Sequence, residues 1–492
     1  MTRYSHLITD SNAKWWTLGA MCFALFMLML DNTVVNVALP SIQADLGSSL
    51  SSLEWTVNGY LLSFGVLLVT GGRLGDIFGR RRAFLVGVTI FALSSATAGL
   101  ATSTTTLIAS RVIQGVGGAL MMPATLSIVT NAFEPHERGK AIGTWAGVSA
   151  LALAIGPVVG GLLTEHVSWR AIFYLNVPVA IGAVIATLFA VRESRDDTVG
   201  REIDYAGVGA LTAGLTALVL ALIESNSWGW GSPAIVGLLA GSVVMLGAFV
   251  VIERRVARPM VELPLFKTRN FVGTNLVALV VTFAMMAQFF FVTLYMQNIL
   301  GFSPVQAGLR FLPATLMIVV FAPVAGRLTD RIGPRWLIGG GLSLVSISLY
   351  WLTTIQVGTT YADIWPSFTL MGLGMALVMS PMSTAAMNAV AVAKAGVASG
   401  ILSMNRMIGG TLGIAVIGAV FASMAPGGTR DPAAFVDAFT SSMWVATGVT
   451  TLGAVIAIGL LRGKAERAQP IVDAPATPAN ELVTGELERV PA

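Results

Sequence analysis

The fold is decided by two loops of similar sequence: residues 72–82 read GRLGDIFGRRR, and residues 326–335 read GRLTDRIGPR. Six positions agree when the second loop is shifted back by 254 residues. A looser match, at an offset of 257 residues, aligns RGKAIG at 138–143 with KAGVASG at 394–400. The chain therefore contains two related halves that follow one another in the same order.

Long apolar segments separate these loops. The sequence is 55% hydrophobic and 11% charged, whereas an ordinary soluble domain is roughly 25% charged. The apolar residues form blocks of about 20 residues, the length of a helix that crosses a bilayer. In hydrocarbon each backbone group needs a partner within its own segment, so the spans must be helices. We expect an all-α polytopic membrane protein rather than a soluble enzyme of several domains.

Fourteen spans are predicted, and the repeat arranges them as two six-helix halves with two helices inserted between them. The spans lie near residues 15–39, 55–73, 83–101, 107–130, 140–163, 171–190, 205–223, 234–252, 271–297, 306–326, 336–355, 364–386, 398–423 and 441–461. The N-terminal half then covers 15–191, the inserted pair 205–252 and the C-terminal half 271–461. Residues 1–14 and the tail 462–492, which is rich in Pro, Ala and Glu, are expected in the cytoplasm, the tail as a disordered segment. Parallel halves around a central site suit a transporter in which each half moves as a body.

Basic residues predict the orientation, because Lys and Arg in short loops favour the cytoplasmic side. With the N-terminus inside, 24 of the 29 basic residues fall in inner loops or tails, and only Arg170 and Arg430 fall in outer loops. Both termini are therefore predicted in the cytoplasm. The basic residues gather in short loops rather than on a soluble face, so nucleic acid is not an expected partner.

Metal, cofactor and enzyme chemistry are not expected. One cysteine, Cys22, and three scattered histidines provide neither a disulfide framework nor a metal cluster. No phosphate-binding loop of the GxxxxGK[ST] type is present, and no paired carboxylates or His-rich spans indicate catalysis.

Four motifs together resemble a known family. They are the loop at 72–82, DNTVVNVALP at 31–40 in the first span, RVIQGVGG at 111–118 in the fourth, and a fifth-span segment from Gly143 to GPVVGG at 156–161. The fifth-span segment departs from the family pattern at Ala152, where glycine is usual. The chain resembles the major facilitator superfamily, in its fourteen-span branch of drug:proton antiporters that export multiple drugs and quaternary ammonium compounds. All four motifs lie in the N-terminal half, so the C-terminal half is assigned from the loop repeat and the span count.

Asp31 is the candidate proton-carrying residue. It lies about 12 Å inside the first span, at ~1.5 Å per residue, where a carboxylate usually faces a cavity or a partner. Burial disfavours its charged form and a nearby guanidinium favours it, so the side chain could load and lose a proton. The alternative interpretation is a carboxylate that caps a helix broken beside Pro40.

Arg111 lies roughly 9 Å inside the fourth span, at a depth close to that of Asp31. The resemblance implies that the first and fourth spans line the central cavity, so the two charges can approach each other. Our hypothesis is that Arg111 pairs with deprotonated Asp31 and is freed when Asp31 is protonated. A permanent buried salt bridge is the alternative.

The fifth-span motif predicts a kink and close helix contacts, because proline removes a backbone donor and glycine lets another helix approach. As the resemblance implies, these contacts seal the cavity against proton leak and mark an exporter. Ordinary small-residue packing remains the alternative. The residues of this antiporter motif are Gly143, Gly156, Pro157, Gly160 and Gly161.

The two repeated loops are expected to act as a conformational latch at the inner ends of the spans. Charges at helix ends are favourable there, and contacts between loops and halves would hold the outward-open state. A simple basic loop that sets orientation is the alternative, although it does not explain the spaced glycines and aspartate. The latch residues are Gly72, Asp76, Gly79, Arg80, Arg81, Asp330 and Arg331.

Soft and polar side chains inside the spans are candidates for substrate contact, since Met and aromatic walls adapt to varied apolar molecules. They are Asn36, Gln114, Met122, Met286, Phe290 and Arg406. Arg406 has no acidic partner visible in the sequence, so structural and functional roles are equally open. Three acidic residues near outer span ends, Glu54, Glu224 and Asp363, are expected to be solvated.

The function predicted from these features is proton-coupled export of amphipathic drug-like molecules across the bacterial cytoplasmic membrane. Partners are then the substrates, protons and the lipid bilayer, and a monomer is expected. A dedicated exporter of an endogenous metabolite or lipid is an alternative within the same class. A receptor or scaffold that transports nothing is the alternative from another class, and it would release no proton on binding a ligand.

Overall fold

The computed structural model describes residues 12–134, 137–195, 203–256, 259–390, 394–425 and 431–462. The expected tail from residue 463 onward, and residues 1–11 of the expected N-terminal segment, lie outside these ranges.

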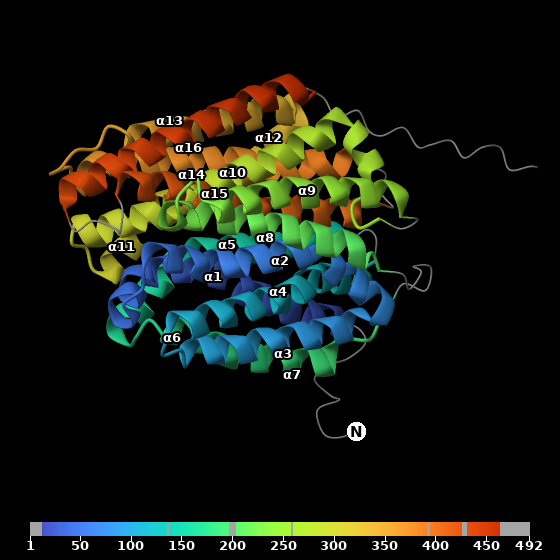
Figure 1. Cartoon of the computed structure of the whole chain (residues 1–492). Coiled ribbons are helices and arrows are strands. Elements are labelled where there is room, and N and C mark those ends of the chain that lie inside the picture. Colours follow the sequence, from blue (N-terminus) through green and yellow to red (C-terminus); the bar gives the residue numbers. More distant parts are fainter. Residues whose placement is uncertain are drawn as a thin grey trace, which may run out of the picture.

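The helices of the N-terminal part alternate in direction along one axis (Figure 1). They are α1 (Ala13–Leu46), α2 (Leu50–Phe78), α3 (Arg80–Gly99), α4 (Thr104–Ala132), α5 (Arg138–His166), α6 (Ala171–Tyr174) and α7 (Asn176–Ala190). The pair α8 (Tyr205–Trp228) and α9 (Pro233–Arg255) follows.

The C-terminal part has the same alternation, with two spans assembled from two pieces each. Its elements are η1 (Leu263–Lys267), α10 (Arg269–Leu294), η2 (Tyr295–Ile299), α11 (Pro304–Arg310), α12 (Leu312–Ile332), α13 (Pro334–Leu352), α14 (Tyr361–Asn388), α15 (Ala395–Met424) and α16 (Pro432–Leu460). The sixth predicted span consists of α6 and α7, and the tenth consists of α11 and α12.

All fourteen predicted spans are helical. Within the described ranges, twelve helices are long and apolar enough to cross a membrane, or up to thirteen if the bent α5 is counted as one span. The remaining predicted span is α13, whose Arg335 and three successive glycines, 339–341, lower its apolar character. It nevertheless packs inside the bundle against α14 and α16.

Short polar residues start several helices and glycines end them. The side chains of Ser49, Ser103 and Ser303 accept hydrogen bonds from the backbone at the starts of α2, α4 and α11, which satisfies donors that the helix itself leaves free. The repeated loops turn through glycine at the same position, with φ of +112° at Gly79 and +81° at Gly333. The repeat in sequence is therefore a repeat in backbone geometry.

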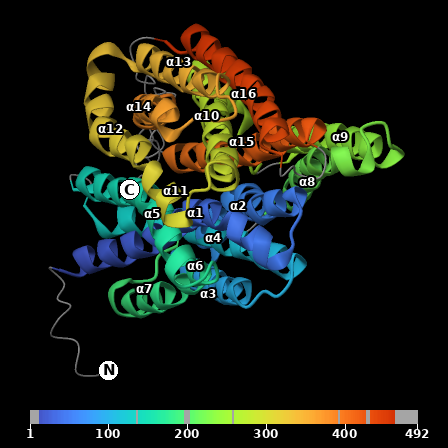
Figure 2. The same cartoon turned by 90° about the vertical axis from the view of Figure 1, so that its left-hand side faces the viewer.

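The helices group into an N-terminal bundle, α1–α7, and a C-terminal bundle, α10–α16 (Figures 1 and 2). Helices α1 and α10 are central, with 83% of their most apolar windows buried, whereas the figure for α9 is 11%. The α8–α9 pair lies to one side, where α8 packs on α2 and α15 and α9 packs on α8 (Figure 2).

Contacts between the bundles are made chiefly by α5 with α11 and α12, and by α2 with α15. The two bundles therefore meet along two seams related by the internal repeat, because α5 and α15, like α2 and the α11–α12 span, occupy equivalent places in the two halves.

Candidate functional site

Asp31 and Arg111 form a direct, buried ion pair. Arg111 Nη1 donates to Asp31 Oδ2 at 2.5 Å, and the two side chains are 1% and 0% exposed, respectively. Arg111 Nε also donates to the backbone carbonyl of Thr56 on α2, at 3.2 Å. The approach that the sequence predicts between the first and fourth spans is therefore present as contact.

Two amides complete the hydrogen bonding of the Asp31 carboxylate. Its Oδ1 accepts from Gln114 Nε2 at 3.0 Å and from Asn176 Nδ2 at 2.9 Å. Gln114 Oε1 in turn accepts from Arg111 Nη1 at 2.7 Å, and Asn176 also reaches Ser95 Oγ at 3.0 Å. Every group around the carboxylate donates, which is the pattern expected for its charged form.

Aromatic rings cover the cation. The Arg111 guanidinium carbon lies 4.2 Å from the centroid of the Tyr60 ring and 5.7 Å from that of Phe173, distances at which the face of a ring attracts a cation. The pair is thus enclosed by residues of α1, α2, α3, α4, α6 and α7, entirely within the N-terminal bundle.

Helix α1 does not break beside Asp31. It runs from Ala13 to Leu46 with Pro40 inside it, so the alternative in which Asp31 caps a broken helix is wrong. Pro40 lies more than two turns beyond Asp31, and the carboxylate is held by side chains of other helices instead of by free backbone donors.

The antiporter motif connects α5 to helices of both bundles. A Cβ added to Gly156 would collide with the Thr33 side chain, and one added to Gly160 would lie 2.6 Å from the Val34 carbonyl oxygen, both on α1. A Cβ added to Gly161 would lie 2.9 Å from the Cα of Val305, at the start of α11 in the C-terminal bundle. Glycine is required at these places because the neighbouring helix lies too close to leave space for a side chain.

Further contacts strengthen this seam, which we call the α5–α11 junction and define by Pro157, Gly161, Glu165, Val305 and Gly308. A Cβ added to Gly308 would meet the Pro157 backbone, and Glu165 Oε2 accepts from the Val305 amide at 2.8 Å. Helix α5 bends by 41° between its segments 140–153 and 155–166, beside the proline that removes a backbone donor.

Gly143 differs from the other glycines of the motif. It is exposed, and an added Cβ would meet nothing within 4 Å. The expectation that it takes part in close packing is therefore wrong for this conformation, because its end of α5 has no helix against it at that point.

These bundles and their junction can be compared with known proteins. The family model described as Major Facilitator Superfamily matches residues 21–414 and, in a second alignment, residues 274–487. This chain belongs to the Major Facilitator Superfamily. It is accordingly a multi-pass membrane transporter and not an enzyme.

Relatives of this superfamily member carry the names of resistance and export proteins. The chain is 38% identical over 411 residues to the tetracenomycin C resistance and export protein of Streptomyces glaucescens, covering 83% of this chain and 76% of the relative. It is 39% identical over 480 residues, 95% of each chain, to the puromycin resistance protein pur8 of Streptomyces alboniger. It is 36% identical over 408 residues, 83% of this chain and 76% of the relative, to the multidrug resistance protein Stp of Mycobacterium tuberculosis. The transporter is thus of the efflux type.

Among solved structures, the peptide transporter POT in complex with sulfate matches with a TM-score of 0.66 at 14% identity, over 92% of this chain and 98% of that one. At this identity the match supports the major facilitator fold alone.

The first repeated loop of this major facilitator makes its hydrogen bonds within its own bundle. Asp76 Oδ1 accepts from Arg80 Nε at 2.9 Å, and Arg81 Nη2 donates to the Leu188 carbonyl at 3.0 Å. Glu193, after α7, accepts from the Arg81 amide at 3.0 Å, and its carboxyl carbon would lie 2.6 Å from a Cβ added to Gly79. These contacts join helices of one half.

The remaining latch residues whose side chains the structure describes add no hydrogen bond or ion pair between the bundles. A Cβ on Gly72 would lie 3.2 Å from Pro123 Cβ on α4, Arg331 is exposed, and the Asp330 side chain lies outside the described part of the chain. A latch between the two halves in another conformation stays a prediction.

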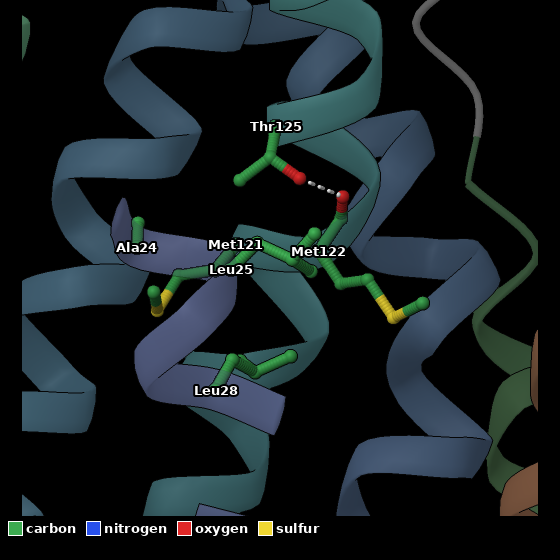
Figure 3. Close-up of a pocket in the computed structure, with 6 residues that line it drawn as sticks. All are labelled: Ala24, Leu25, Leu28, Met121, Met122 and Thr125. Carbon is green, nitrogen blue, oxygen red and sulfur yellow. Dashed lines mark hydrogen bonds between the residues drawn. The ribbon is translucent and has the colours of Figure 1, made fainter. Parts of the chain in front are cut away.

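The candidate substrate residues do not gather around one pocket. Met122 lines a hollow of about 130 Å³ between α1 and α4, in which Met121 and Met122 extend in opposite directions (Figure 3). Because this volume includes open solvent, the hollow is far too small to enclose a ligand, whose pockets typically measure ~300–1,000 Å³. Its other lining residues are Ala24, Leu25, Leu28 and Thr125.

Other candidates are buried in contacts between helices. Met286 and Phe290 of α10 are 4% and 0% exposed, and Met286 packs against Gly410 of α15. Asn36 is also buried, with an Oδ1 that has no hydrogen-bond partner. Arg406 Nη2 contacts Met379 Sδ at 3.4 Å, and its Nε is likewise buried without a partner. Gln114, expected to contact substrate, belongs to the Asp31 ion pair instead.

Sequence reasoning missed Asn176 and misplaced Glu54. Asn176 starts α7 and gave no signal beyond a polar residue at a span end. Glu54 was expected to be solvated and is only 2% exposed, because α2 begins at Leu50, earlier than predicted, and α15 covers its first turns. The expectation holds for Asp363, which is exposed, whereas Glu224 is half-buried.

We expect Asn176→Ala to lower the free energy of unfolding by about 1–3 kcal/mol, since a buried carboxylate loses one donor. Thermal unfolding in detergent measures the effect. Asn298→Ala changes an exposed residue in the same way and serves as the control. Equal melting temperatures for the two variants would contradict this role of Asn176.

We expect Gly161→Val to separate α5 from α11, because its side chain needs space that the α11 backbone occupies, a strain of about 1–3 kcal/mol. The matched control is Gly143→Val, in the same helix and motif but facing open space. A lower melting temperature for Gly161→Val alone is the expected result, and equal stability of both variants would refute the close contact.

Proposed function

We propose that this transporter exports amphipathic drug-like molecules from the bacterial cytoplasm in exchange for protons that enter. The observation that carries the proposal is the Asp31–Arg111 pair, a carboxylate and a guanidinium that are fully buried in the centre of the N-terminal bundle. Ionisable residues inside a membrane protein are expensive to bury and commonly mark proton pathways.

The geometry explains how one proton would change the structure. Both Asp31 oxygens accept hydrogen bonds from Arg111, Gln114 and Asn176. A protonated carboxyl has a hydroxyl that must donate, so at least one of these contacts has to break. Arg111 would then be a buried cation without its counter-ion, which is strongly unfavourable unless the helices move. Protonation of Asp31 thereby drives α1 and α4 to a new arrangement.

Asp31 acts on the substrate indirectly in this account, because neither member of the pair is exposed to a cavity. Substrate and proton compete through the arrangement of α1 and α4 rather than for one binding position. A membrane potential of 100 mV, negative inside, contributes about 2.3 kcal/mol for each proton that enters.

The conformation fits a transporter open towards the cytoplasm. The α5–α11 junction closes the end of the molecule at which α1 ends and α2 begins, and the distribution of basic residues among the loops favours an outside location for that end. At the opposite end, Gly143 and Gly147 of α5 face open space. We therefore infer that both termini are cytoplasmic and that the halves 15–191 and 271–461 move as bodies, in one monomer.

The relatives' names and the residues available support the proposed substrate class. Proteins named for resistance to puromycin and to multiple drugs indicate amphipathic molecules as cargo. Met122 of α4 and Met379 of α14 lie half-buried, and flexible Met side chains accommodate varied apolar shapes. Arg406, beside Met379, provides a cation for polar or anionic groups.

A dedicated exporter of one self-made compound is the second candidate. The observation in its favour is the relative named for resistance to and export of tetracenomycin C. A panel of drugs separates the two: a dedicated exporter would protect an efflux-deficient host against a single chemical series.

We expect Asp31→Asn to abolish uphill export of puromycin and ethidium in proteoliposomes with an imposed pH gradient, because an amide cannot carry the proton. The protein should still insert, since the amide can accept and donate within the same network. Asp437→Asn, at an exposed position of α16, should transport at the wild-type rate. Wild-type export by Asp31→Asn would overturn proton coupling through this residue.

A further inference from the structure

Glu54 is a buried carboxyl group between the two bundles. It lies in the second turn of α2 and is 2% exposed. Its carboxyl carbon would be 2.5 Å from a Cβ added to Gly418 of α15, and Oε2 would be 2.7 Å from it. Glu54 thus fills the space that Gly418 leaves free, and α2 and α15 belong to different halves.

Within the described part of the chain, the surroundings of Glu54 offer no counter-charge. Among the described residues, no hydrogen bond or ion pair joins its side chain to another group. An apolar cluster joins the same three helices. It includes Trp55, which follows Glu54 on α2, Ile223 on α8, and Ala415, which lies about one turn before Gly418 on α15.

Among the residues that the structure describes, the charged groups on the neighbouring helices provide no cation for Glu54. Glu224 on α8 acts on it electrostatically, and it is also an acid. Arg111 of α4 reaches the Thr56 carbonyl on α2 but is committed to Asp31. Helix α15 carries no charged residue after Arg406, which lies about 18 Å below Gly418 at ~1.5 Å per residue. An unpaired carboxylate in such a place is far more unfavourable than a neutral carboxyl.

The internal repeat shows that this carboxyl replaces a backbone contact. The offset of 257 residues that relates α5 to α15 matches Gly161 with Gly418, and the offset of 254 matches Glu54 with Gly308. In the α5–α11 junction, Gly161 and Gly308 both lie against backbone of the opposite helix. At the equivalent seam, Gly418 remains but Glu54 takes the place of the second glycine. One seam is held by backbone packing and the other contains an ionisable group.

We propose that Glu54 is a second proton-binding site, which gates the α2–α15 seam from the outside. In the closed seam Glu54 holds a proton; when α2 and α15 part, water enters and the carboxyl ionises. Low outside pH therefore closes the seam and higher pH favours its opening. The inserted helix α8 contributes by covering the site with an apolar face and by placing Glu224 beside it.

The proton of this site returns to the side from which it came. The closed seam binds one proton more than the open seam, and both uptake and release take place through the outer end, so Glu54 adds nothing to the number of protons transported. The inference rests on the proposed alternation of the two halves, but not on Asp31 as the coupling residue.

The test measures how far the outer end opens as a function of pH. Cysteines replace Val167 and Val357, which are exposed loop residues at that end in the N-terminal and C-terminal bundles, in a Cys22→Ala background. Spin labels on both report the distance between bundles by pulsed electron paramagnetic resonance in nanodiscs, without substrate, from about pH 5 to about pH 9.

In the protein with Glu54 intact, the ratio of open to closed molecules should rise by up to about tenfold per pH unit, the slope for release of one proton. Glu54→Gln and Glu54→Leu keep the side chain neutral at every pH, so both should remain closed with no such rise. Two variants are used because one of them could fold poorly.

An unchanged pH profile in either folded variant, or a flat profile with Glu54 intact, would overturn the proposal. Asp31→Asn separates this result from the coupling mechanism, since it should abolish coupled export and keep the Glu54-dependent rise. Coupled export by Asp31→Asn would refute the proposed function while leaving the gating result as it stands.

Discussion

The burial of one carboxylate and one guanidinium in hydrocarbon is the constraint on which the rest of this structure depends. Neither charge is tolerable alone at that depth, and together they are tolerable only when the remaining donors and acceptors are also paired. Asp31 on α1 and Arg111 on α4 therefore bring in Gln114, Asn176 and the Thr56 carbonyl. The N-terminal bundle is assembled around this network, and for that reason a change of one proton can alter the packing of several helices at once.

The bundles contact each other along two seams. The internal repeat relates the two seams, but the residues in them differ. In the first, glycines of α5 and α11 place backbone on backbone and a carboxylate of Glu165 binds the first turn of α11. In the second, Glu54 lies against Gly418. The α8–α9 pair packs over the second seam and not over the first. In the proposed cycle these inserted helices keep water and lipid away from Glu54, which would otherwise be solvated.

Much of this architecture follows from the sequence, because hydrophobic length and loop charge are local properties. The fourteen helical segments, the repeated glycines at Gly79 and Gly333, and the similar depths of Asp31 and Arg111 depend on spacing along the chain. The approach of Asp31 to Arg111 was implied by the resemblance to the superfamily. Hydrogen-bond partners from other helices cannot be read from local spacing. Asn176 binds Asp31 from 145 residues away, and no sequence pattern near Asn176 indicates that contact. Glu54 was misplaced for the same reason, since its burial comes from α15 and α8. Gly143 is the opposite case: it belongs to the antiporter motif, but in this conformation no neighbouring helix packs against it.

The central claim is that the proton on Asp31 and the bound substrate exclude each other. Its most direct test is proton release in weakly buffered detergent solution, followed with a pH-indicator dye as puromycin or ethidium is added. The account predicts that the wild-type protein releases protons as it binds the substrate. Asp31→Asn, which is neutral like protonated Asp31, should bind the substrate more weakly and release no proton per molecule bound. Binding by the wild-type protein without proton release, or equal release by the two proteins, would contradict the account.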